Sequence, residues 1–193
     1  MSLTKVLTIV FLLIAVGIAY YLFDRIKFSI DEEDRIARIE SQVIDKLKFI
    51  RDAEILYKEA NGQYTSDWNK LISFLDTGSL YIVQRREETT LLDYGAEETV
   101  IHIDTIGSIP VRDTLYHDPA YDKFKIQNIA QIPVSNERFE LYANKIKRNN
   151  VDVDVFEVVD TAPVNPERRG DESIRGPLRV GSRTEVTTGG NWE

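Results

Sequence analysis

The sequence has no cysteine at all, and it has only two histidines and one methionine among 193 residues. Without cysteine, the chain can form no disulfide framework, no thiolate zinc or iron–sulfur site and no cysteine nucleophile. Basic residues are also few: 24 Lys and Arg stand against 32 Asp and Glu, which gives a net charge of −8. Because affinity for nucleic acid rests on clustered positive charge, we expect no nucleic-acid partner.

Catalytic motifs are missing from the sequence as well. His102 and His117 have no second histidine at a metal-ligand spacing, and no phosphate-binding glycine loop or nucleophile elbow occurs. The acids at 31–34 lack EF-hand spacing, and those at 151–159 alternate with valines, as on the wet face of a strand. We therefore predict a non-enzymatic protein without cofactor or metal. A membrane-tethered hydrolase that uses His117 is the least favoured alternative.

A long apolar run is the most informative feature that the chain does have. Val6–Phe23 contains no charged residue and spans roughly 27 Å as a helix, close to the hydrocarbon thickness of a bilayer. The run predicts a transmembrane anchor within residues 1–28. A cleavable signal peptide and a helix buried in a larger assembly are open alternatives. The anchor prediction depends on Val6, Phe11, Leu12, Leu13, Ile14, Tyr20, Tyr21 and Phe23.

The charges beside this run suggest an orientation. Lys5 before the run and the four acids Asp31 to Asp34 after it favour a cytoplasmic N-terminus. Arg25 and Lys27, which also follow the run, favour the opposite orientation. We expect a cytoplasmic N-terminus, a single pass through the inner membrane and a periplasmic domain, with the lipid bilayer as the first partner.

Residues 29–159 predict an α+β domain that begins with a long amphipathic helix. The helix is expected over residues 30 to 60 and to end at Asn61-Gly62, which tolerates a positive φ. Its apolar face is expected to pack on the domain's own sheet, and a coiled-coil seam between copies is the alternative. The packing face consists of Ile36, Ile39, Val43, Leu47, Ile50 and Tyr57.

A second helix and one small antiparallel sheet complete the expected domain. The helix is expected to start at a cap on Thr65 or Ser66 and to end at Thr77-Gly78. Period-two patterns then predict strands at 80–85, 99–105, 108–111, 138–143 and 151–159, with a tight turn at Asn149-Asn150 between the last two. Residues 86–98 and 113–131 are expected to be loops.

Residues 160–193 differ in composition, being rich in Gly, Pro and Arg and without periodicity. They predict an extended or disordered tail. Trp192 stands alone in this polar segment and is a candidate interface anchor, with an exposed Trp of no function as the alternative. The candidate partner-docking residues are Arg179, Arg183 and Trp192.

The order of anchor, amphipathic helix and α+β domain resembles type IV pilins and type II secretion pseudopilins over residues 6–83. The family's turn after the long helix is matched by Tyr57 and Lys58 and by Gly62, Tyr64, Thr65 and Trp68. Parts of the chain are also similar to uncharacterised proteins of Bacteroidota and of crAss-like phages. The pilin resemblance implies a pilin-like external domain. It does not extend to the family's Gly-Phe cleavage site or its early glutamate, since no acid lies between Met1 and Phe23.

Together these features predict a membrane-anchored scaffold or docking subunit that binds an unidentified protein partner, with self-association as an open alternative. The alternative is a phage-encoded virion or tail structural protein, whose apolar helix is buried against other subunits.

Overall fold

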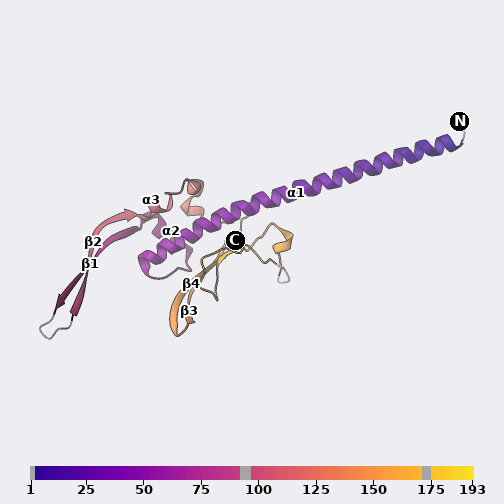
Figure 1. The fold of residues 1–193 in the computed structure, drawn as a ribbon. Coiled ribbons are helices and arrows are strands. Elements are labelled where there is room, and N and C mark those ends of the chain that lie inside the picture. Colours follow the sequence, from indigo (N-terminus) through magenta and orange to yellow (C-terminus); the bar gives the residue numbers. More distant parts are fainter. Residues whose placement is uncertain (1–2, 92–96, 171–174) are drawn as a thin grey trace. The chain divides into compact units, whose positions relative to one another are not determined.

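The computed structural model describes residues 3–91, 97–170 and 175–193, and Figure 1 shows their arrangement into helices and strands. The chain is α+β: a long N-terminal helix precedes two small antiparallel sheets. It divides into two units, residues 1–42 and 43–193, which are described separately. The helices are α1 (Leu3–Asn61), α2 (Trp68–Thr77) and α3 (Val111–Leu115), and the strands are β1 (Ser79–Leu91), β2 (Glu97–Pro110), β3 (Glu140–Arg148), β4 (Val151–Val159) and β5 (Arg179–Gly181).

The side chains of the apolar run that predicts a transmembrane anchor, Val6–Phe23, lie only partly within the described residues. Within the described part of the chain, no helix combines the length and the apolar character needed to cross a membrane. The side chains of Val6, Thr8 and Ile9 lie outside the described residues.

Four of the six residues of the predicted packing face of α1 are buried. Ile39, Val43, Leu47 and Ile50 are buried, while Ile36 and Tyr57 are half-buried. These positions repeat at three and four residues, so they share one side of the helix.

The C-terminal end of α1 is also confirmed. Gly62 has a φ of +77° and donates its N–H to the carbonyl of Lys58 at 2.7 Å, which closes the last turn. Glycine adopts this left-handed backbone without a Cβ clash.

Helix α2 lies where it was expected, but its cap differs. Asp67, rather than Thr65 or Ser66, is the N-cap, and its side chain accepts from the N–H of Asn69 at 2.8 Å. Leu71 and Leu75 are fully buried on the inner face of the helix.

Strands β1 and β2 form a two-stranded arm, which was predicted only in part (Figure 1). The sequence indicates short strands and a loop at 86–98, whereas 86–91 and 97–98 are paired strand residues; 92–96 lie outside the described residues. The register shifts between Ile82 and Val83. The arm is exposed over most of its length, so no buried face imposes the apolar–polar alternation from which strands are recognised.

Strands β3, β4 and β5 form a second antiparallel sheet, so the chain has two sheets where one was predicted. The turn between β3 and β4 is confirmed at Asn149 and Asn150, whose φ values are +49° and +66°. Val155 and Val158 are buried, and Glu157 is buried too, although its place in the alternation predicted an outward side chain.

Two segments without periodicity are part of the packed unit. Within 113–131, predicted as a loop, α3 and two 3-10 turns bury Leu115, Tyr121, Ile126 and Ile129. In the predicted tail, β5 pairs with β4, and Leu178 and Val180 are buried. Leu178 and Val180 therefore belong to the core of this sheet and not to a disordered tail.

Candidate functional site

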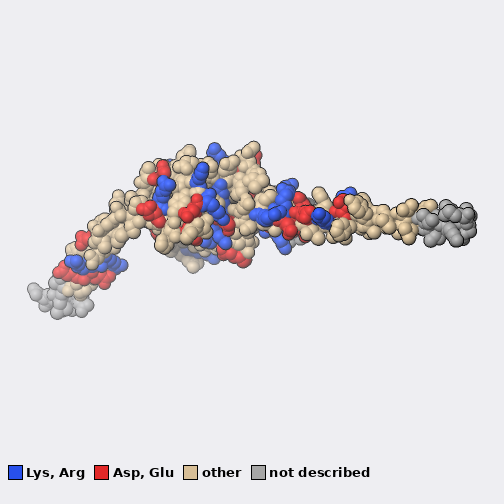
Figure 2. All heavy atoms as spheres, turned by 90° about the horizontal axis from the view of Figure 1, so that it is seen from above, with Lys and Arg blue, Asp and Glu red and all other residues tan. Residues whose placement is uncertain are grey.

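The predicted anchor residues lie on the part of α1 that belongs to residues 1–42, and their described side chains are exposed. The exposed fractions run from 51% for Ile14 to 73% for Tyr20, with Leu13 at 64% and Phe23 at 68%. In Figure 2 the helix is tan between its charged residues and its grey end. Exposed apolar surface of this extent usually marks an interaction site.

The turn that follows α1, which contains Gly62, Tyr64, Thr65 and Trp68, contacts a buried carboxyl group. Glu54 is fully buried, and its Oε2 accepts from the N–H of Thr65 at 3.1 Å, while Oε1 has no hydrogen-bond partner among the described residues. Burial raises the pKa of Glu54 to about 8, against a smaller lowering from the Thr65 hydrogen bond. Glu54 therefore carries a proton at neutral pH.

Aromatic residues fix the same turn onto the second sheet. Tyr64 packs on Phe156 with ring centroids 4.6 Å apart, and the indole N–H of Trp68 donates to the carbonyl of Phe139 at 3.2 Å. The ammonium of Lys58 lies 4.5 Å from the centre of the Tyr64 ring, within cation–π distance. The four turn residues thus form a structural junction in this unit.

Two of the three predicted docking residues are engaged within the chain. Arg183 donates from Nε to Glu157 Oε2 at 2.6 Å and from Nη2 to Glu140 Oε1 at 2.8 Å. Arg179 lies 3.8 Å from the other oxygen of Glu157, and Tyr142 lies beneath the Arg183 guanidinium. Both arginines compensate the buried Glu157 carboxylate and hold the β5 region on the sheet.

Trp192, the third predicted docking residue, is half-buried on its own unit. Its ring lies so close to Gly190 that a Cβ there would come within 2.4 Å of three ring atoms. The neighbouring Glu193 lies 3.5 Å from Arg51 on α1. Contacts within the chain therefore account for much of the Trp192 surface.

The histidines and acids show no catalytic arrangement among the described residues. His102 is exposed on β2, 3.6 Å from Glu88, and His117 is exposed after α3. No group of three or more His, Asp or Glu side chains in the described ranges is placed to hold a metal ion.

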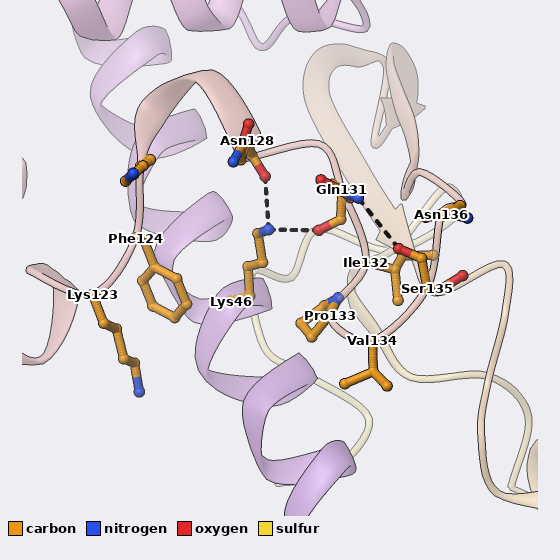
Figure 3. A pocket seen from close by; sticks show the side chains of 11 residues that line it. Lys46, Lys123, Phe124, Asn128, Gln131, Ile132, Pro133, Val134, Ser135 and Asn136 are labelled. Atoms are coloured by element: carbon orange, nitrogen blue, oxygen red, sulfur yellow. Dashed lines mark hydrogen bonds between the residues drawn. The ribbon is translucent and has the colours of Figure 1, made fainter.

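A pocket around Lys46 was not predicted. Lys46, on the packing side of α1, is buried, and its ammonium donates to the carbonyls of Asn128 at 2.7 Å and of Gln131 at 2.5 Å. The ammonium lies in a cavity of about 620 Å³, and in Figure 3 Phe124 and the 132–136 turn lie to either side of it. The sequence feature that could indicate this pocket is Lys46 itself, a lysine at a helix position where the periodicity predicts an apolar residue.

The electrostatics of this pocket are one-sided. Its lining includes Lys46, Lys123 and Lys125 but no aspartate or glutamate. Burial lowers the pKa of Lys46 to about 8. The lining residues are Lys46, Lys123, Phe124, Lys125, Asn128, Gln131, Ile132, Pro133, Val134, Ser135 and Asn136.

Comparison with known proteins adds no identification: no protein family, no curated protein and no solved structure matches this chain. The resemblance to pilins and pseudopilins stays a prediction.

Proposed function

We propose that this chain is a non-enzymatic docking subunit whose N-terminal helical segment lies in apolar surroundings that other molecules supply. The observation that carries this proposal is the exposure of Phe11, Leu12, Leu13 and Ile14, each between 51% and 64%. At 100° per residue, these four consecutive positions reach every side of the helix. Helices that are apolar on every side occur buried, in the core of a large protein or in lipid.

The energy available from this segment is enough to support association. Full burial of a large apolar side chain stabilises by about 1.5–3 kcal/mol. The side chains from Val10 to Phe23 have about half of their surface exposed. Burying that surface in a complex would contribute roughly 10 kcal/mol to the free energy of association. Lost translational and rotational freedom costs about 4–15 kcal/mol, so further contacts from the folded unit strengthen the complex.

The β1–β2 arm offers such contacts. Tyr81 is 72% exposed and Ile103 is 66% exposed, and the outer edges of both strands have no partner strand in the described sheet. Open strand edges and exposed apolar side chains are both features to which another chain can add. The arm therefore supports a role in docking rather than in catalysis.

The placement of the protein stays a prediction. A single-pass inner-membrane location is expected from the sequence, with a virion as the alternative, and the docking proposal depends on neither. Carbonate extraction of membranes and mass spectrometry of purified particles distinguish the two locations.

Photo-crosslinking tests the proposal directly. A photo-reactive phenylalanine analogue at Phe11 is expected to give adducts with protein or lipid in cells, whereas the same analogue at Lys147, exposed on β3, gives none. A second test places a charge in the segment: Leu13→Asp should reduce recovery of the chain in high-molecular-weight or membrane fractions, and the exposed Gln42→Asp on the same helix should not. A full chain that stays monomeric and gives no Phe11 adduct would refute the proposal.

A further inference from the structure

The pocket around Lys46 contains a buried positive charge that the described residues do not neutralise. Lys46 is 9% exposed, and its hydrogen-bond partners are two neutral carbonyls, of Asn128 and Gln131. No carboxylate among the described residues pairs with it. Buried charges in proteins are normally paired, because an isolated ion loses much of its solvation energy on leaving water.

The rest of the lining has the same sign of charge. Lys123 is neutralised by Asp45 at 2.7 Å, whereas Lys125 is exposed at the pocket and has no ion pair among the described residues. The whole chain has a net charge of −8, whereas this cavity is lined by three lysines and no acid. The local potential therefore favours an anion.

Hydrogen-bonding capacity points the same way. An ammonium group has three N–H donors, and the carbonyls of Asn128 and Gln131 accept from two of those on Lys46. The third remains for a ligand. The side chains of Asn128, Ser135 and Asn136 add polar groups to the same lining.

The turn that closes one side of this pocket is strained. The N–H of Ser135 donates to the carbonyl of Ile132 at 3.2 Å, and Val134 in this turn has a φ of +62°. A positive φ is costly for a β-branched residue, and glycine or asparagine is usual at such a position. Val134 is also 73% exposed, so its own burial does not compensate the strain. Strained, over-determined backbone of this kind concentrates at ligand sites.

We propose that this pocket binds an oxyanion, a carboxylate or a phosphate group, through the ammonium groups of Lys46 and Lys125. The site is separate from the apolar segment and from the arm, so it does not depend on the docking role. Lysines recognise such groups as point charges, and a buried ammonium gains most from a counter-charge because the local dielectric is low.

The test is an NMR titration of the full chain with sodium phosphate and, separately, with sodium acetate, against sodium chloride at the same ionic strength. We expect saturable shifts in the amides of residues 123–136 with phosphate or acetate, but not with chloride. The pKa of Lys46 should rise when the oxyanion is bound, a change that a purely structural tether does not produce. Tighter binding of phosphate assigns a phosphate ligand, and tighter binding of acetate assigns a carboxylate.

Variants make the outcome decisive. Lys125→Gln should weaken binding about three- to fivefold, the range for an exposed charge. Lys46→Gln should weaken it at least tenfold if that variant folds, since it removes the charged donor. Lys147→Gln removes an exposed lysine from β3 and should leave affinity unchanged. Unsaturable shifts, an unmoved Lys46 pKa, or equal affinity in Lys125→Gln and the unmodified chain would overturn the proposal, leaving Lys46 as a structural tether only.

Discussion

Replacing the buried Glu54 by glutamine should change how the stability of the folded unit depends on pH. The pKa of Glu54 is raised from its ordinary value of 4.5 to about 8, chiefly by burial. Between these two pH values the folded chain holds a proton on Glu54 that the unfolded chain has lost. The folded state therefore binds more protons, and its stability falls as pH rises through this window.

The size of the effect follows from the width of the window. Each pH unit changes the free energy of unfolding by about 1.36 kcal/mol, so Glu54 lowers stability by about 5 kcal/mol between pH 4.5 and pH 8. Glutamine has nearly the same shape as the protonated carboxyl and does not titrate. Glu54→Gln should therefore be more stable than the unmodified chain at pH 7 by about 3 kcal/mol, and the advantage should vanish near pH 4.5.

The measurement is urea unfolding of the full chain from pH 5 to pH 8, followed by circular dichroism. The difference in unfolding free energy between Glu54→Gln and the unmodified chain should grow by about 4 kcal/mol over this range. Glu59→Gln, an exposed glutamate on the same helix, is the matched control and should leave the difference nearly constant. Parallel pH profiles for Glu54→Gln and the unmodified chain would show that Glu54 is ionised in the folded state, and would refute the reasoning.

Three further substitutions have expected outcomes that the same unfolding assay checks at pH 7. Arg183→Ala leaves the buried Glu157 without its closest donor and should lower stability by about 2 kcal/mol; an unchanged midpoint would mean that Arg179 compensates. Val134→Gly removes the left-handed strain of a β-branched residue and should raise stability by about 1 kcal/mol, and a loss would contradict it. Gly62→Ala places a Cβ on a residue with φ of +77° and should cost about 1 kcal/mol, although nothing within 4 Å obstructs the added atom.

Local sequence rules predict the parts of this fold that depend on near neighbours. The buried face of α1 follows from the spacing of Val43, Leu47 and Ile50, and its end follows from the conformational freedom of Gly62. The β3–β4 turn follows from two asparagines, residues that tolerate positive φ. In each case the physical cause lies within a few residues of its effect.

The remaining features depend on partners far along the chain or on surface that is not buried. Lys46 is held by carbonyls that lie 82 and 85 residues away, and every residue has a carbonyl, so no side-chain pattern marks them. The apolar–polar alternation of β4 predicts that Glu157 points outward. It does not reveal Arg183, 26 residues later, whose hydrogen bond makes the burial of Glu157 possible. The full length of the β1–β2 arm was not predicted, because strand patterns reflect burial and most of the arm is exposed.

The arm leaves the folded unit and returns to it at one point. Ser79 pairs with Pro110, and the N–H of Val111 donates to the carbonyl of Gly78 at 3.0 Å, so the chain enters and exits through adjacent residues. The core does not fix the length of the β1–β2 hairpin beyond the Ser79–Pro110 pair. Adding or removing two residues from each strand preserves which side chains share a face, since the pattern repeats every two residues. The reach of this protein can therefore vary during evolution while the packed core stays constant.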